Sequence, residues 1–195
     1  MTRTLSLALG ALLLAAGCGD DDGSSVDAST GADGSAPTGA TTYYVVRHTE
    51  RDPGLDPPIN AEGEVRAVAL ADRLEDAGID EIVTTEFIRG QQSGQPLADR
   101  LGLAITVAPF TMDASWTDFA QAVGGWQRDR EIAGQTYLMI GHSGGYNTTL
   151  LQRLGAEVPT ASGERYEELV IVVRQPDGTV SFSVESYGGE SSLDP

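Results

Sequence analysis

From residue 42 to residue 185, short runs of β-favouring residues alternate with longer segments in which apolar residues recur every three or four positions. A short apolar or alternating run predicts a strand, and recurrence near 3.6 residues predicts a helix. The pattern predicts strands over residues 43–47, 81–84, 103–107 and 136–140, helices over 60–76, 87–101, 115–130 and 145–154, and two final strands over 168–174 and 179–185. Strands that alternate with helices predict an α/β fold, a three-layer α/β/α sandwich with a mostly parallel central sheet. The last two runs are joined by Gln-Pro-Asp-Gly, which indicates a C-terminal antiparallel hairpin.

The predicted helices carry local signals at their ends and inside them. Asn60 is a good N-cap for the first helix, and Gly78 lies just past its end. Pro96 falls inside the second helical pattern, so we expect either a kink or a late helix start there. Gly124 and Gly125 interrupt the pattern of the third helix.

The first 41 residues have a different character. Residues 5–16 are apolar but too few to span a bilayer, which needs about 20, and they have the length of a signal-peptide core. They lead into Ala-Ala-Gly-Cys, which resembles the bacterial lipobox and implies that Cys18 becomes a lipidated N-terminus. The following Gly, Asp, Ser, Ala and Thr residues predict a flexible tether. We therefore expect a lipoprotein signal peptide over 1–18, a tether over 19–41 and a domain over 42–195, anchored by lipid at the bacterial cell envelope. The alternative is a buried helix in which the cysteine has no role.

The net charge restricts the possible partners. The chain has 29 acidic and 12 basic residues, a formal charge of −17, and every basic residue is arginine. Residues 41–195 alone keep 24 acidic and 11 basic residues. So acidic a surface repels nucleic acids, and we expect no nucleic-acid partner. One cysteine and two histidines allow neither a disulfide within the chain nor a Cys/His zinc cluster.

Both histidines fall where a parallel sheet places its binding crevice, outside the carboxyl ends of the strands. His48 follows Arg47 at the end of the first predicted strand, and His142 follows the fourth. Arg89, near the start of the second helix, can point into the same crevice. Guanidinium groups bind phosphate through paired N–H donors, and an imidazole can attack phosphorus. The residue types therefore indicate phosphoryl chemistry that requires no metal or other cofactor.

Three blocks of sequence carry a family resemblance: RHTE at 47–50, TTEFIRGQQSGQPLADRLGL at 84–103 and LMIGHSGGYNTTLLQRLG at 138–155. Together they resemble the histidine phosphatase superfamily, which has the phosphoglycerate-mutase-like fold. The resemblance implies that His48 is the nucleophile that becomes phosphohistidine, and that Arg47, Arg89 and His142 bind the phosphoryl group. It also implies hydrolysis of a small phosphomonoester or a phosphoprotein. Short stretches between the strands favour a phosphatase over a mutase.

The sequence departs from this family at several positions. Thr49 replaces the usual glycine after the nucleophile, Thr85 stands where serine is common, and Asn147 follows His142 at an unusual spacing. Many members supply a proton-donating carboxylate from the loop after the third strand. By resemblance that acid is Asp113 here, with Asp118 in the following helix and Glu50 as further candidates.

Two other functions fit parts of the sequence. Residues 141–145 match G-x-S-x-G, which would make Ser143 the nucleophile of an esterase, but no histidine follows to serve as its base. A domain that binds an anion or a partner without turnover is the second alternative.

We interpret Trp116 and Trp126 as packing residues. Arg51 either extends the basic rim of the site or forms a surface ion pair with a neighbouring carboxylate.

Overall fold

The computed structural model describes residues 39–113, 115–143, 145–159, 163 and 165–191. The expected signal peptide with Cys18, and the tether as far as residue 38, lie outside these residues. The first strand starts at Thr41, one residue before the expected domain boundary, and Thr41 is buried. No helix in the described part of the chain combines the length and apolar character needed to cross a bilayer.

The sheet confirms the α/β prediction. It has six strands in the order β3-β2-β4-β1-β5-β6. Their bounds are β1 Thr41–Arg47, β2 Glu81–Thr84, β3 Ile105–Val107, β4 Thr136–Gly141, β5 Glu168–Arg174 and β6 Val180–Ser186. The first four pair in parallel, and β5 and β6 form the predicted antiparallel hairpin, with β5 also antiparallel to β1. The sheet is therefore mixed, with its parallel part at the β3 side.

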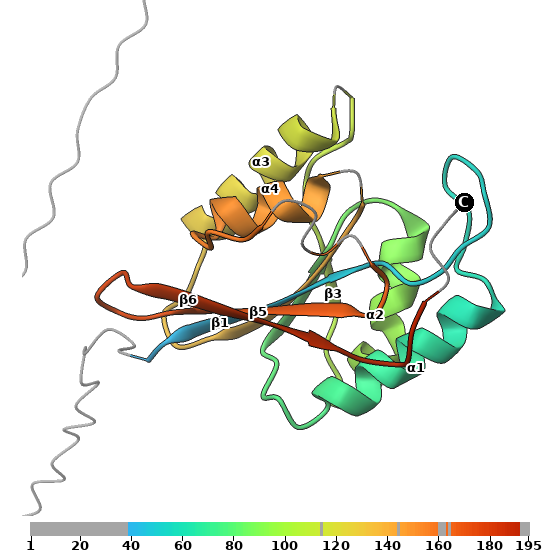
Figure 1. Ribbon diagram of the computed structural model, residues 1–195, viewed down its shortest axis with the longest axis horizontal. Helices are drawn as coiled ribbons and strands as arrows, with labels where there is room; N and C mark the ends of the chain where they lie inside the picture. The colour runs from blue at the N-terminus through green and yellow to red at the C-terminus, as the bar shows by residue number, and fades with distance from the viewer. Residues whose placement is uncertain (1–38, 114, 144, 160–162, 164, 192–195) are drawn as a thin grey trace, which may run out of the picture. The chain divides into compact units, whose positions relative to one another are not determined.

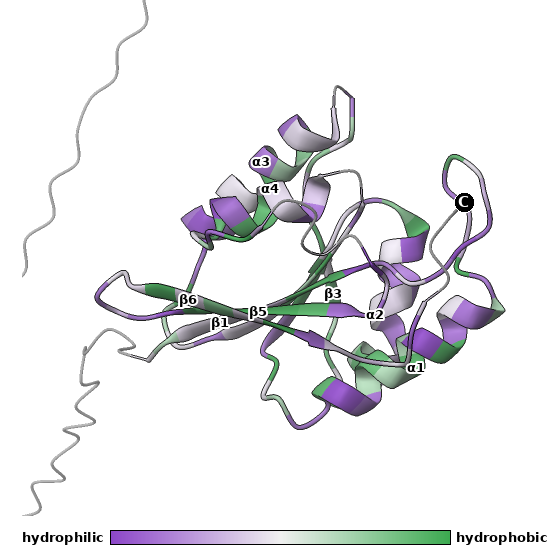
Figure 2. Ribbon diagram, in the orientation of Figure 1, coloured by the Kyte–Doolittle hydropathy of each residue, from purple (hydrophilic) through white to green (hydrophobic). Residues whose placement is uncertain are grey.

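Helices cover both faces of the sheet (Figure 1). They are α1 Ala61–Leu74, α2 Ile88–Leu101, α3 Trp116–Asp129 and α4 Tyr146–Arg153. The helices pack in two pairs, α1 against α2 and α3 against α4. Figure 2 shows hydrophobic residues along the strands between the two pairs and hydrophilic residues on the outer faces of the helices. This is the three-layer arrangement that the alternating pattern predicts.

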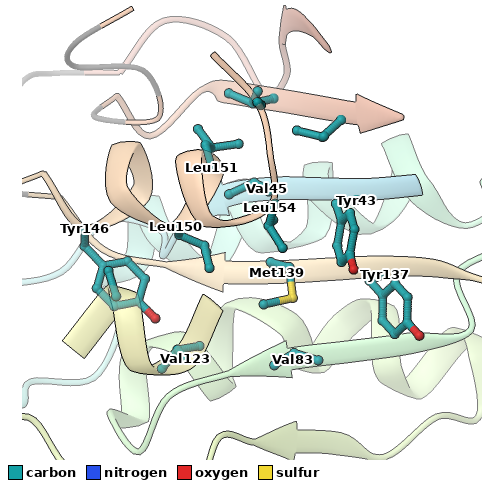
Figure 3. Close-up of a cluster of buried hydrophobic side chains, with 14 of the residues drawn as sticks. Tyr43, Val45, Val83, Val123, Tyr137, Met139, Tyr146, Leu150, Leu151 and Leu154 are labelled. Atoms are coloured by element: carbon teal, nitrogen blue, oxygen red, sulfur yellow. The ribbon is translucent and has the colours of Figure 1, made fainter. Parts of the chain in front are cut away.

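Two apolar cores separate the sheet from its helices. The core beneath α3 and α4 includes the aromatic residues Tyr43, Tyr137 and Tyr146 together with Met139 and Leu150 (Figure 3). A second core fills the opposite face, between the sheet and the α1/α2 pair. Both cores reach the carboxyl ends of β1 and β4, so the residues that follow these strands start from rigid backbone.

The helix ends agree with the sequence in most respects. The Asn60 side chain accepts a hydrogen bond from the Gly63 backbone N–H, 3.0 Å away, and so caps α1. Helix α2 starts at Ile88 and runs through Pro96, so the late start we allowed is wrong. Pro96 is partly exposed, where water can satisfy the carbonyl that its missing N–H leaves unbonded.

Two expectations from the sequence need correction in detail. Helix α3 is continuous across Gly124 and Gly125. A Cβ atom at Gly124 would lie 2.7 Å from the Cβ of Arg153 on α4, so this glycine permits close helix packing. The third strand is shorter than expected and starts at Ile105, because the Leu103 backbone N–H still donates to the Ala98 carbonyl at the end of α2.

Candidate active site

The two histidines lie side by side at the carboxyl ends of neighbouring strands. In the β1–β4 pair, Arg47 is opposite Gly141, and His48 and His142 are the next residues of each strand. The His48 backbone N–H donates to the Gly141 carbonyl, 3.0 Å away, which extends the ladder by one bond. The imidazole rings are 5.4 Å apart between centroids, and both side chains are buried. Strand register thus brings together the pair that the sequence predicted.

The His48 ring is held in one tautomer. Its Nδ1 lies 2.8 Å from the backbone carbonyl oxygen of Thr49, which can only accept, so Nδ1 carries the proton. The other nitrogen, Nε2, therefore keeps its lone pair. Burial lowers the pKa of His48 to about 3, and the positive charges of Arg47, Arg89 and Arg51 act in the same direction, against the raising effect of the Thr49 bond. His48 is a neutral imidazole at neutral pH.

His142 is fixed by polar groups at both ring nitrogens. Thr85 Oγ1 is 2.8 Å from Nε2, and an Arg89 N–H points at Nδ1 over 3.5 Å. The arginine can only donate, so Nδ1 accepts and Nε2 donates to the threonine. Burial lowers the pKa of His142 well below its usual value, and electrostatic interaction with His48 and with the charge of Arg89 adds to this. Thr85, which replaces a common serine, therefore retains a hydroxyl in contact with this histidine.

Aromatic side chains surround the His142 ring. The ring centroids of Trp116, Tyr146 and Phe87 lie 4.7, 5.0 and 5.1 Å from it. Trp116 also packs on Phe119, so the packing role that the sequence suggested places this residue directly against the site. Trp126 instead contacts Phe110. The aromatic residues exclude water from one side of His142.

The two predicted phosphate-binding arginines are buried and held by stacking. Arg47 lies over the ring of Tyr166 at 3.9 Å and donates to its hydroxyl over 3.0 Å. Arg89 lies over the ring of Phe87 at 4.2 Å. The Tyr166 ring is also 5.9 Å from His48. Sequence reasoning missed Tyr166 because it belongs to the segment between α4 and β5, which has no recognisable motif.

A proline-rich loop, residues 51–59, borders the site on the Arg89 side. It is closed at its base by a β-bridge between Arg51 and Ile59. Its Asp56 carboxylate accepts from Arg89 Nη1 at 3.2 Å and from the Ile88 backbone N–H at 3.1 Å. Asp56 therefore caps the N-terminus of α2, whose own N-cap, Phe87, has no side-chain hydrogen bond. Asp56 was not predicted as a cap, because a cap normally comes from the adjoining residue.

The departures from the family pattern have structural explanations. Thr49 is fully buried, and its backbone N–H and hydroxyl contact Ser93 Oγ at 2.9 and 3.2 Å. Its side chain is thus directed to α2. Asn147 donates to the Gly163 carbonyl at 3.0 Å. A Cβ at Gly141 would lie 2.0 Å from the Asn147 Oδ1 atom, so glycine is required at the end of β4.

The candidate acids lie in different environments. Glu50 forms an ion pair with Arg66 at 2.6 Å in which both side chains are only 4% exposed. Asp118 accepts from the Ser115 hydroxyl at 2.8 Å as part of the α3 cap. Asp113 is exposed, and in the described part of the chain no hydrogen bond or ion pair joins it to the histidines or arginines. The structure therefore brings together His48, His142 and the arginines, but not the acids.

Ser143 and the grouping of metal-ligating side chains are two further features of the described part of the chain. Ser143, the alternative nucleophile, forms no hydrogen bond to either histidine there. No group of three histidine, cysteine or carboxylate side chains is placed to hold a metal ion in that part of the chain.

Fold and site together define an α/β protein with paired histidines at the carboxyl ends of two neighbouring parallel strands and two buried arginines. The chain belongs to the histidine phosphatase superfamily (branch 1), whose family model matches residues 42–172. A comparison with curated protein sequences finds no match.

Solved structures share the fold at low sequence identity. The mycobacterial glucosyl-3-phosphoglycerate phosphatase has a TM-score of 0.57 at 14% identity, covering 76% of this chain and 98% of that one. The protein histidine phosphatase SixA, solved with tungstate, has 0.54 at 18%, covering 74% and 96%. The phosphoglycerate mutase of Bacillus anthracis has 0.57 at 16%, covering 77% and 93%. Neighbours in fold thus include both phosphatases and a mutase.

Proposed function

We propose that the protein is a metal-independent phosphomonoesterase that acts through a phosphohistidine intermediate on His48. The observation that carries this proposal is the His48 tautomer: Nδ1 is held by the Thr49 carbonyl, and Nε2 keeps its lone pair beside two buried guanidinium groups. Membership of the superfamily supports phosphatase activity at this site.

In the first step, His48 Nε2 attacks phosphorus, the N–P bond forms and the P–O bond to the leaving group breaks. Arg47 and Arg89 bind the phosphoryl oxygens and offset the charge that accumulates on them, and neutral His142 donates its Nε2–H to a phosphoryl oxygen once that N–H leaves Thr85. Asp56 occupies one side of Arg89 in the free protein and, being about half exposed, can move into solvent when a phosphoryl dianion takes its place.

We assign Asp113 as the proton donor to the leaving oxygen. It lies three residues before Trp116, whose ring contacts His142, and its carboxylate is not engaged by any described side chain. In the second step, water attacks the phosphohistidine, the N–P bond breaks, inorganic phosphate leaves and neutral His48 is restored. Asp113, now deprotonated, accepts the proton of that water.

Hydrolysis of p-nitrophenyl phosphate by the full chain in the presence of EDTA tests this function. We expect turnover that His48→Ala abolishes and Ser143→Ala retains. Loss of turnover in Ser143→Ala with retention in His48→Ala would instead indicate a serine hydrolase. A folded protein that shows no turnover between pH 5 and 8 would support a domain that binds anions without catalysis.

A further inference from the structure

A third arginine lies beside the site without a role in the mechanism above. Arg51 follows His48 by three residues and forms the base of the 51–59 loop. The same loop contacts Arg89 through the carbonyl of Leu55 and the carboxylate of Asp56. The loop that begins at Arg51 thus reaches Arg89 through Leu55 and Asp56.

The Arg51 guanidinium has unused hydrogen-bonding capacity. Its Nη1 donates to the Asp52 carbonyl at 2.9 Å. Among the described residues, its Nε is buried without a partner, and no carboxylate forms an ion pair with it. The surface ion pair that the sequence allowed is thus absent from that part of the chain, and Glu50 is paired with Arg66 instead. The side chain is partly exposed, so a ligand can reach it.

The positive charges of Arg51 and Arg47 act unfavourably on that of Arg89. After burial, the charge of Arg51 is the strongest influence that lowers the pKa of Arg89, ahead of Arg47 and ahead of the opposing effect of Asp56. An arrangement that is unfavourable in the free protein becomes favourable when an anion binds, which is typical of functional sites. Arg51 is therefore best explained by a ligand.

The charges indicate what that ligand carries. Both histidines are neutral at neutral pH, because burial lowers their pKa values. A phosphoryl dianion that displaces Asp56 from Arg89 is balanced by Arg47 and Arg89. The charge of Arg51 then remains for a second anionic group, on a protein surface that otherwise repels anions.

We propose that Arg51 binds a second anionic group of the substrate, a carboxylate or a second phosphate close to the ester oxygen, and so selects for phosphomonoesters with two anionic groups. This inference rests on the proposed phosphatase function. Arg51 acts here as a specificity residue, and the bond-breaking steps are those already described.

Three substrates with the same two-carbon leaving group test this selection: ethyl phosphate, 2-phosphoglycolate and ethylene glycol bisphosphate. We expect kcat/KM of the full chain to be about 10- to 100-fold higher for the two doubly anionic compounds, the value of a charge-assisted hydrogen bond. Arg51→Gln should remove most of this preference through KM, and Arg51→Lys should keep part of it. Comparison of the carboxylate and the bisphosphate shows which second group is preferred.

Arg73→Gln is the matched control, because it removes one exposed positive charge on α1 whose partner among the described residues is Glu185. We expect it to keep the preference. Equal kcat/KM for all three compounds in the natural chain, with good turnover, would overturn this inference and leave the phosphatase function intact. An equal loss for all three in Arg51→Gln would also overturn it, since Arg51 would then bind the transferred phosphoryl group.

Calorimetric binding separates this inference from the function itself. If the chain hydrolyses neither these compounds nor p-nitrophenyl phosphate, the proposed function fails. Tighter binding of ethylene glycol bisphosphate than of ethyl phosphate, lost in Arg51→Gln, would still support the second anion site. Equal affinities would exclude it.

Discussion

Glu50 Oε1 and Arg66 Nε form an ion pair of 2.6 Å in which neither side chain reaches solvent appreciably. Arg66 also donates to the backbone carbonyls of Tyr187 and Gly189, at 3.1 and 3.0 Å. The pair therefore connects the residue two positions after the nucleophile to α1 and to the segment after β6. It ties the backbone that follows His48 to these two segments.

Breaking this pair should destabilise the fold strongly. We expect Glu50→Gln to lower the free energy of unfolding by about 3–5 kcal/mol, because Arg66 is left with an uncompensated buried charge. Urea unfolding followed by circular dichroism measures this. Glu50→Gln combined with Arg66→Met should recover part of the loss. A stable Glu50→Gln variant whose turnover is lost only on poor leaving groups would make Glu50 the acid instead.

Buried neutral His48 should make the protein sensitive to acid. Its pKa is about 3 in the folded state and near 6.5 when unfolded, so the unfolded chain binds the proton first as pH falls. This contribution to stability is complete above pH 6.5 and is lost at about 1.4 kcal/mol per pH unit below it. Unfolding free energies of the natural chain and His48→Gln, compared between pH 7 and 4, should diverge. Parallel curves would contradict the lowered pKa.

Tyr166 should position Arg47. Tyr166→Phe keeps the ring beneath the guanidinium but removes the 3.0 Å bond, and we expect a loss of about tenfold in kcat/KM, the value of one such hydrogen bond. Tyr166→Ala removes both the stacking and the hydrogen bond, and should lower kcat/KM further. A positioning role predicts that kcat falls along with the rise in KM for p-nitrophenyl phosphate. Equal activity of the phenylalanine variant would show that stacking alone orients Arg47.

The adjacent glycines of α3 offer a matched test of helix packing. Gly124→Ala brings a methyl group within 2.7 Å of the Arg153 Cβ, and should cost about 1–3 kcal/mol of unfolding free energy. Gly125→Ala meets only the Nη2 atom of the same flexible side chain, at 3.2 Å, so its gain in helix propensity of about 1 kcal/mol should dominate. The thermal unfolding midpoint of Gly124→Ala should lie below that of the natural chain, and that of Gly125→Ala should lie above it.

The expected lipid anchor can be tested in a bacterial host. If Cys18 is lipidated, the full chain should partition with membranes, and Cys18→Ala should release it to the soluble fraction. Metabolic labelling with a fatty acid detects the modification directly. A labelled Cys18→Ala variant would exclude this cysteine as the attachment site.

Patterns in the sequence predict the features that depend on interactions between residues close together in the chain. The strand over residues 81–84 agrees at both ends, and Asn60 caps its helix, because apolar runs and capping groups act over a few residues. The histidine pair was also predictable, since parallel strands share one edge of the sheet. Asp56 and Tyr166 were not, because each reaches the site from a loop whose path depends on distant contacts. The need for glycine at position 124 of α3 likewise follows from a distant contact, the approach of Arg153.

The hydrogen bond from His48 to Gly141 makes the spacing of the two imidazoles a property of the sheet itself. Amide protons at this junction should therefore exchange with deuterium only when the domain opens as a whole. The two imidazoles should therefore keep their relative positions on heating until the whole domain unfolds. Its inactivation should follow the same temperature curve as its global melting, so residual activity would report directly on the folded fraction.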